Sequence, residues 1–371
     1  MSILRSVAVY VFLLFFFSCI KLSNSLNRTL EELTVVQLAP AHRIVIGGNA
    51  GTILSSLDGL TWTTGSIGDS NFNITALAYS GRNFVAVGMT SGSSICRIYY
   101  SANASAWVQA SIPSINCTSS VGLLDVTTGG NTMLAVGTAS GTAPIILRSV
   151  DHGVTWSAGS CASCGNPVTP VIYDGTYFIL SAIDANPNPV TFRSTDGSSF
   201  SISGSPFSTN AAKQNRVTRF INISGVGVIA AGSSNGATEF TQSSISLNHS
   251  TSWTMDSGIP ATGLFQASSA PLSLARGLAY SGTRLVAVGD NCRIAFTNSP
   301  ASLSWTNPPT ITGCTAGTVW RGLIYDGSKF VATGTNAGGQ GQIAVSPTGS
   351  GTDWTITTPG TGPLTGIALS P

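Results

Sequence analysis

The chain has 371 residues, of which 42% are hydrophobic and only 8% are charged. Glycine is abundant, at 42 residues, whereas the helix-forming residues Glu, Lys and Gln are scarce, and this composition argues against a helical or α/β protein. The formal net charge is +2, with no cluster of Lys and Arg, so we expect no nucleic-acid partner. The composition therefore favours an all-β fold.

The first predicted element is an apolar targeting segment. Arg5 precedes a nearly unbroken apolar run from Val7 to Phe17, which is too short and too close to the terminus to be a membrane span. The residues around Ser18 and Cys19 resemble a bacterial lipoprotein box, and the segment is similar to the leaders of spirochaetal lipoproteins. This resemblance implies that Cys19 is lipidated.

The leader also sets the expected domain boundaries. We expect a signal peptide of the lipoprotein type over residues 1–18, a tether over 19–38 and a folded domain over 39–371. Ordinary signal-peptidase cleavage after Ser25 is the alternative, and it would release a secreted protein. In the first case the protein is exported and anchored in the cell envelope, with contact to the membrane through the lipid alone.

From Arg43 onward the chain repeats a pair of strands. One strand recurs at residues 74–81, 275–282 and 321–327. The strand after it alternates small and large apolar residues, as expected of an inner strand between two layers. It occurs seven times: Ile44 to Gly48, Phe84 to Gly88, Met133 to Gly137, Tyr177 to Ala182, Gly227 to Gly232, Leu285 to Gly289 and Phe330 to Gly334.

The period of roughly 40 to 57 residues is typical of four-stranded propeller blades. The first unit lacks an opening strand, whereas the chain ends with an extra one from Leu364 to Ser370. We therefore predict a seven-bladed β-propeller of four-stranded antiparallel blades, in which the C-terminal strand joins the first blade and closes the ring.

A polar octet from Ser149 to Trp156 lies between two predicted strands. Asp151 at the head of the turn is expected to accept backbone amide bonds, Gly153 to adopt a positive φ, and Trp156 to fold back as an apolar lid. The pattern Ser-x-Asp-x-Gly-x-Thr-Trp resembles the Asp-box, or BNR, repeat of sialidase-like and related propellers. That resemblance implies a structural role for the octet, and it leaves function open because the repeat occurs in hydrolases, sorting receptors and assembly factors.

Looser copies of the octet occur along the chain. Two shortened copies have their main positions at Ser56, Asp58 and Trp62, and at Ser194, Asp196 and Phe200. Four degenerate copies, in which the Asp is missing or displaced, run from Ser101 to Trp107, Ser243 to Trp253, Thr297 to Trp305 and Ser346 to Trp354. We expect all of them to hold hairpins closed, away from the axis.

Six cysteines form three expected pairs. Cys96 and Cys117 occupy the same place in the second blade as Cys292 and Cys314 in the sixth, so equivalent within-blade disulfides are expected. Cys161 and Cys164 form a CxxC in a loop without the helix or second ligand pair of a redox or zinc site, so a small loop disulfide is expected and no metal site. Three disulfides fit an oxidising compartment.

Catalytic patterns are sparse. Arg276, Arg293 and Arg321 are the nearest approach to the arginine set that a sialidase would need, and we interpret them as outward-facing strand residues or propeller-face contacts. The remaining acids that would have to supply a glycosidase pair lie at predicted strand ends or hairpin tips: Asp125, Asp174, Asp290 and Asp326.

No further chemistry is indicated, and no cofactor is expected. The three histidines, at positions 42, 152 and 249, are isolated, and Trp320 is expected to pack at the start of a blade. The leading hypothesis is a non-enzymatic, lipid-anchored and monomeric propeller that binds an unknown protein or glycan. A glycoside hydrolase using the central cleft and an assembly factor for an envelope complex are the alternatives.

Overall fold

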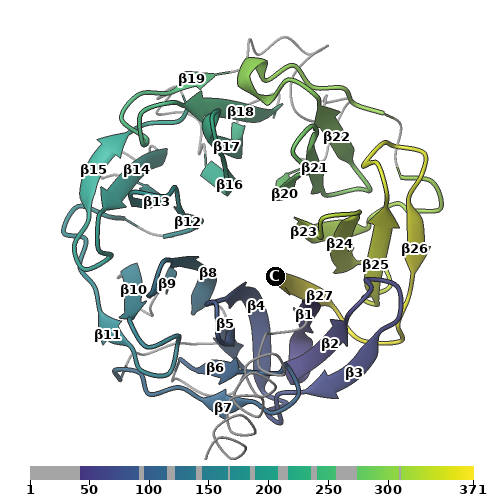
Figure 1. Ribbon diagram of the computed structural model, residues 1–371, viewed down its shortest axis with the longest axis horizontal. Coiled ribbons are helices and arrows are strands. Elements are labelled where there is room, and N and C mark those ends of the chain that lie inside the picture. The colour runs from purple at the N-terminus through teal and green to yellow at the C-terminus, as the bar shows by residue number, and fades with distance from the viewer. Residues whose placement is uncertain are drawn as a thin grey trace, which may run out of the picture. The chain divides into compact units, whose positions relative to one another are not determined.

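The computed structural model describes residues 42–91, 96–114, 122–138, 144–165, 168–183, 189–207, 216–234, 240–255, 274–308 and 311–371. Residues 42–370 form one compact unit, in which seven antiparallel sheets are arranged as a ring (Figure 1). The predicted all-β, seven-bladed propeller is therefore confirmed. The predicted signal peptide, the tether and Cys19 lie outside the described residues.

Each blade contributes strands to concentric positions around the axis (Figure 1). The innermost, or first, strands are β27 (Leu364–Ser370), β4 (Phe72–Tyr79), β8 (Leu123–Gly129), β12 (Val171–Tyr173), β16 (Arg216–Ile223), β20 (Ala275–Tyr280) and β23 (Val319–Tyr325). The second strands are β1 (Arg43–Gly48), β5 (Phe84–Thr90), β9 (Thr132–Thr138), β13 (Phe178–Ile183), β17 (Gly227–Ser234), β21 (Leu285–Gly289) and β24 (Phe330–Thr335).

The outer half of each blade is shorter. The third strands are β2 (Thr52–Ser56), β6 (Ile98–Ser101), β10 (Pro144–Ser149), β14 (Pro189–Ser194), β18 (Phe240–Ser246), β22 (Ile294–Thr297) and β25 (Gly341–Ser346). The fourth strands are β3 (Thr63–Ser66), β7 (Val108–Gln109), β11 (Ser157–Ala158), β15 (Ser201–Gly204), β19 (Thr254–Met255) and β26 (Thr355–Thr357). The helical turns of the described chain are η1 (Asn49–Gly51) and η2 (Pro300–Ser302).

The sixth blade departs from the predicted four strands. Its sheet has three strands, and a single antiparallel bridge between Phe296 and Thr306 stands where a fourth strand begins in the other blades. The turn η2 lies between these two residues and shortens the pairing. Its first three strands follow the repeat seen in the sequence.

The core lies between neighbouring blades. In the second blade Val85, Ala86 and Val87 are fully buried, because both faces of the second strand are covered by the adjacent sheets. Val85 and Val87 belong to one apolar cluster with Leu123 and Leu147 of the third blade. The alternation of small and large side chains therefore reflects contact with two neighbours at once.

The ring closes as predicted. Strand β27 pairs with β1 in antiparallel register, from Arg43 opposite Ser370 to Gly48 opposite Leu364. The first blade is thus completed by the two ends of the folded unit. Closure pairs the strand edges that would otherwise remain open at the first and last blades.

Disulfides join Cys161 to Cys164 and Cys292 to Cys314, the pairs expected from the sequence. Cys96 is also disulfide-bonded, and its predicted partner Cys117 lies outside the described residues. The CxxC is therefore a disulfide and not a dithiol metal ligand pair.

Candidate functional site

A β-bulge near the start of each first strand places one additional side chain near the axis. In six blades a register shift between the first and second strands marks the extra residue. In the fourth blade Thr169 has the equivalent place, because the following residue, Pro170, pairs with Ser181 of the second strand. We call these seven residues the bulge ring: Thr75, Leu124, Thr169, Thr218, Arg276, Arg321 and Thr365. All seven line one cavity of about 760 Å³ that is bordered by every blade.

Three of the four threonines of the bulge ring connect neighbouring blades. The Thr75 hydroxyl donates to the Leu123 carbonyl of the next blade at 2.7 Å, and it also lies 3.1 Å from the Val87 carbonyl of its own blade. Thr218 and Thr365 make the same contacts to the first strand of the next blade and to their own second strand. A hydrogen bond of this kind contributes about 0.5–1.5 kcal/mol. Threonine at these positions therefore has a structural role.

Three members of the ring depart from threonine. Leu124 has no hydroxyl, and the guanidinium groups of Arg276 and Arg321 make no hydrogen bond to the next blade within the described residues. Positions that give up a fold-stabilising bond are candidates for a role in function. In a ring of seven, the third blade, which carries Leu124, lies opposite the sixth and seventh blades (Figure 1).

Arg276 is neutralised by a carboxylate. Its Nε and Nη2 atoms lie 2.6 and 3.0 Å from the two oxygens of Asp290, which gives a bidentate pair. Asp290 also accepts the backbone N–H of Leu274 at 3.3 Å. This acid is therefore committed to holding the arginine.

Arg219 lines the same cavity and contacts three other blades. Its Nε donates to the Arg276 carbonyl at 2.9 Å, Nη2 to the Arg321 carbonyl at 3.4 Å, and Nη1 lies 3.5 Å from Asp125 Oδ1. Arg219 and Asp125 line a second cavity of about 170 Å³, together with small residues such as Gly322. Arg219 thus joins the third, fifth, sixth and seventh blades.

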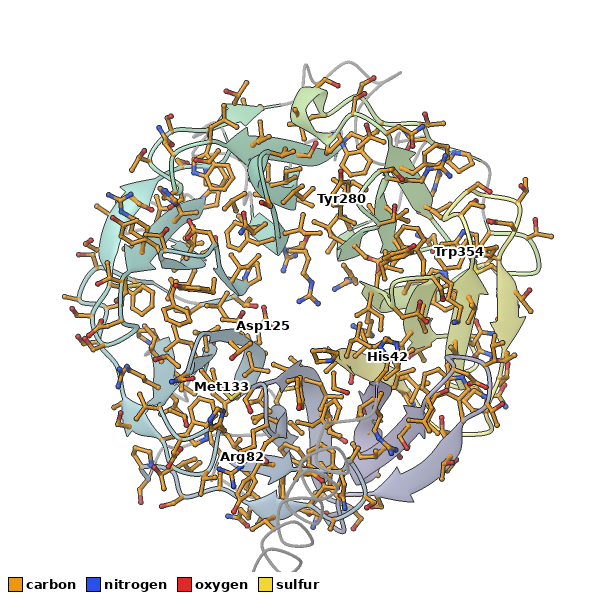
Figure 2. The ribbon with its side chains drawn as sticks, viewed as in Figure 1. His42, Arg82, Asp125, Met133, Tyr280 and Trp354 are labelled. Atoms are coloured by element: carbon orange, nitrogen blue, oxygen red, sulfur yellow. A yellow bond between two sulfur atoms is a disulfide. The ribbon has the colours of Figure 1, made fainter. Side chains whose placement is uncertain are left out.

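Asp125 is an axial residue and not a strand-end residue as we predicted. It is buried within β8 and accepts the backbone N–H groups of Val126 and Val171 at 3.0 and 3.1 Å (Figure 2). Burial raises the pKa of the Asp125 carboxyl, and the charge of Arg219 opposes that rise. Its oxygens are occupied by these three donors.

Arg321 differs from the other two arginines. The residue is half-buried, and its Nε atom is enclosed without a hydrogen-bond partner in the described structure. Burial, followed by the nearby charge of Arg276, lowers the pKa of the Arg321 guanidinium. A desolvated cation next to a like charge is stabilised by an anion, so Arg321 is the position where the cavity presents unsatisfied positive charge.

The structure therefore brings together two of the three arginines noted in the sequence. Arg276 and Arg321 share the cavity, whereas Arg293 is not among its lining residues. Of the two expected roles, that of outward-facing strand residues was wrong for Arg276 and Arg321, and the alternative of propeller-face contacts is not contradicted. Sequence reasoning missed Arg219 and Leu124. The repeat alignment placed Thr75, Arg276 and Arg321 at one equivalent position, and this shared position was the signal that could have grouped the two arginines.

The octet at Ser149 has the hydrogen bonds expected of a closed turn. Asp151 accepts from the N–H and the hydroxyl of Thr155 and from the Ser149 hydroxyl, while the Gly153 N–H donates to the Ser149 oxygen and Trp156 Nε1 to the Gly153 carbonyl. Gly153 has φ of 87°, which glycine adopts without strain. Burial raises the pKa of Asp151, but the bonds from Thr155 and Ser149 outweigh it, so the pKa lies below its usual value.

Other blades repeat this turn. Asp58 and Asp196 accept the equivalent bonds, and backbone bonds from Thr61 and Ser198, respectively, are the main cause of their lowered pKa values. In the fifth blade the turn begins at Ser246, three residues later than the sequence suggested. The lids differ in burial: Trp156 and Phe200 are buried, and Trp62 is half-buried. In the seventh blade the displaced Asp353 supplies the carboxylate.

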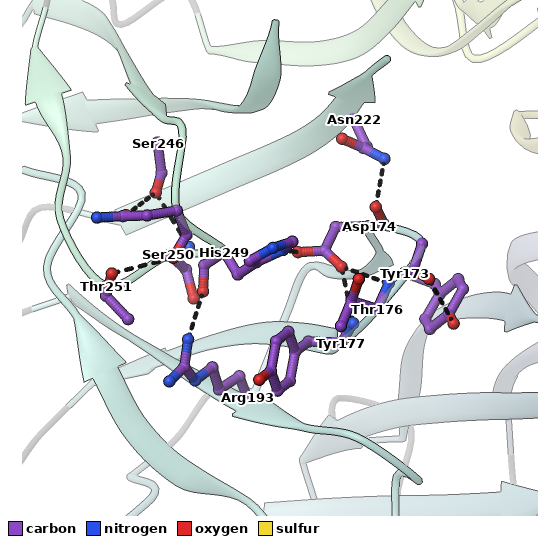
Figure 3. A network of polar contacts seen from close by, with 12 residues as sticks. Tyr173, Asp174, Thr176, Tyr177, Arg193, Asn222, Ser246, His249, Ser250 and Thr251 are labelled. Atoms are coloured by element: carbon purple, nitrogen blue, oxygen red, sulfur yellow. Dashed lines mark hydrogen bonds and ion pairs between the residues drawn. The ribbon is translucent and has the colours of Figure 1, made fainter. Parts of the chain in front are cut away.

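These turns also join each blade to the one before it. His152 Nδ1 lies 3.0 Å from the Ser80 carbonyl of the second blade, and Asn83 donates to the His152 carbonyl at 3.1 Å. Figure 3 shows the corresponding junction of the fourth and fifth blades, where His249 Nδ1 lies 2.7 Å from Asp174 Oδ2. His152, His249 and Asp174 therefore make contacts between blades.

No protein-family model matches the chain, and no curated protein matches it. The chain is similar in structure to YCF48 bound to D1 peptide, with a TM-score of 0.52, 15% identity and coverage of 77% of this chain and 81% of that chain. It is similar to a Bacteroides fragilis protein provisionally assigned as a 6-phosphogluconolactonase, with a TM-score of 0.56, 12% identity and coverage of 90% and 98%. It is also similar to the SapL1 lectin in complex with alpha methyl fucoside, with a TM-score of 0.50, 8% identity and coverage of 78% of this chain and 98% of that chain.

At these identities the comparisons define the class of fold, a β-propeller, and nothing finer. Across the described residues there is no group of three or more His, Cys, Asp or Glu side chains arranged to hold a metal ion. In the same part of the chain, no helix has the length and hydropathy of a membrane span.

Proposed function

We propose that the protein is an exported, lipid-anchored binding module whose axial cavity holds an anionic ligand. The observation that carries this proposal is the half-buried Arg321 side chain in the cavity wall, which has no carboxylate partner in the described structure and whose enclosed Nε atom has no hydrogen-bond partner. An isolated cation in such a place lowers stability unless a ligand compensates it. The cavity volume of about 760 Å³ is within the range typical of small-ligand sites.

A glycoside hydrolase is less well supported. Its mechanism needs two carboxyl groups facing the substrate. Asp290 forms the bidentate pair with Arg276, and Asp125 is held by Arg219 and two backbone amides. One structural neighbour is bound to a peptide and another to a fucoside, so a propeller ring is compatible with either ligand class. The class of ligand therefore has to be inferred from the side chains that line the cavity.

Binding arrays of acidic and neutral peptides and glycans, probed with the full chain, test the proposal. We expect retention to be confined to acidic probes, and to be lost in Arg321→Gln. Arg82→Gln is the matched control, because Arg82 is an exposed arginine far from the axis and its substitution should leave binding unchanged (Figure 2). Equal retention by wild type and Arg321→Gln would overturn the proposal. Turnover of a glycan that is abolished in Asp125→Asn would establish the hydrolase instead.

A further inference from the structure

The axial cavity has two chemically different sides. The cationic side comes from the fifth to seventh blades and contains Arg216, Arg219, Arg276 and Arg321. The opposite side comes from the second to fourth blades, where Met89, Leu124, Ala182, Ile183 and Pro189 line the cavity. A ligand that spans it therefore meets charge at one end and aliphatic surface at the other.

The charge balance on the cationic side favours a single negative charge. Asp290 neutralises Arg276, Asp125 pairs with Arg219, and Arg216 is exposed to solvent. Arg321 is left as the half-buried guanidinium without a carboxylate in the described structure. One monoanion would satisfy it, whereas a second charge would enter the desolvated cavity uncompensated.

The form of the unpaired group favours a carboxylate. The neighbouring Arg276 binds Asp290 through its Nε and Nη2 edge, and Arg321 lines the same cavity without a carboxylate partner in the described structure. The planar fork of a guanidinium matches the two oxygens of a carboxylate. The Asp290 pair is thus an internal example of the contact that the ligand would make.

The rest of the lining favours an aliphatic body over a sugar. No aromatic side chain is found among the described lining residues, so the cavity has no ring on which a sugar face would stack. The hydroxyls of Thr75, Thr218 and Thr365 already donate to backbone carbonyls, so these three are committed to the fold and not to a polyhydroxylated ligand. Leu124, opposite the arginines, replaces a threonine with an apolar side chain.

We propose that the ligand is an aliphatic monocarboxylate whose carboxylate binds Arg321 and whose hydrocarbon part lies against Leu124 and Ile183. This inference rests on the proposed function, since it specifies the ligand of the same cavity. Such a group occurs in a free aliphatic acid and at the C-terminus of a polypeptide that ends in an aliphatic residue. The two sources share the carboxylate and the apolar body.

Calorimetric titration of the full chain with acetate, butanoate and hexanoate tests the apolar side. Each methylene buried should tighten binding roughly fourfold. Hexanamide, which lacks the charge, should bind about 10-fold to 100-fold more weakly than hexanoate. Leu124→Thr should reduce the gain with chain length without affecting acetate, because it removes part of the aliphatic side and leaves the arginines in place.

Arg321→Gln separates the two proposals. If this variant loses affinity for acetate and hexanoate alike, but wild type binds the two equally, the anionic site stands and the aliphatic ligand is refuted. If wild type and Arg321→Gln bind every acid equally, the proposed function itself fails. Arg82→Gln, the matched control, should behave as wild type.

A peptide arm distinguishes the sources. Acetyl-Ala-Ala-Leu with a free carboxylate is compared with its C-terminal amide and with 4-methylpentanoate, which has the same branched end. Tighter binding of the free peptide than of 4-methylpentanoate supports a polypeptide C-terminus, and binding of 4-methylpentanoate alone supports a free acid. Equal binding of the peptide and its amide, together with no binding of either aliphatic acid, refutes the inference.

Discussion

Restoring the threonine of the bulge ring at position 321 should stabilise the protein and remove its ligand site. In Arg321→Thr the new hydroxyl can donate to the Leu364 carbonyl, the acceptor equivalent to Leu123 for Thr75. That bond contributes about 0.5–1.5 kcal/mol, and loss of the buried unpartnered Nε adds about 1–3 kcal/mol. Lost packing of the arginine stem opposes both. We expect a net gain of about 1–3 kcal/mol.

The assay is urea unfolding of wild type, Arg321→Thr and Arg321→Val, with hexanoate titration of each folded protein. Valine removes the unpaired charge without supplying the hydroxyl, so it should gain less than threonine, by about 0.5–1.5 kcal/mol. Both variants should lose binding of hexanoate. The reasoning is refuted if Arg321→Thr is less stable than wild type, or no more stable than Arg321→Val. A gain in stability with a loss of binding is the expected exchange of stability for function.

Three further outcomes follow from the contacts. Thr75→Val should cost about 1–2 kcal/mol in urea unfolding, since it removes both bonds of that hydroxyl, and unchanged stability would contradict the structural role of the ring threonines. Asp151→Ala should cost about 1–3 kcal/mol without affecting hexanoate binding, and lost binding in a folded variant would show that the turn is part of the site. The lowered pKa values of Asp151 and Asp196 contribute stability that is present above about pH 4 and is lost as pH falls through the folded-state pKa values. The raised pKa of Asp125 has the opposite effect, because protonation of this carboxyl at low pH favours the folded state. Unfolding midpoints between pH 5 and 2 should therefore decrease, and less steeply in Asp151→Ala; a slope equal to that of wild type would count against the turn carboxylates.

Much of the fold was predictable because it depends on local, repeated patterns. The alternation of small and large residues in segments such as Phe84 to Gly88 identifies a strand covered on both faces. The extra C-terminal strand indicates how the ring closes. The turn at Ser149 to Trp156 was also predictable, since its hydrogen bonds join residues within eight positions.

The site was only partly predictable, because its residues come from different blades. The sequence aligned Arg276 and Arg321 with Thr75, but it did not show that a bulge turns that column toward the axis. Arg219 was missed because its contacts lie 57 to 102 positions away in the chain. The sixth blade was expected to have four strands, and the turn at Pro300–Ser302 reduced its outer pairing to one bridge.

By itself, then, the sequence determined the number of blades, the way the ring closes and the turns that hold each blade, since all three are set by repetition and by contacts between nearby residues. The tertiary structure alone decided which charges are paired. Arg276 and Arg321 occupy equivalent positions in the sequence repeat, but Asp290 forms hydrogen bonds with Arg276 and not with Arg321. The physical reason is that pairing and burial depend on where bulges from separate blades meet, and this meeting point is defined only when the ring has closed.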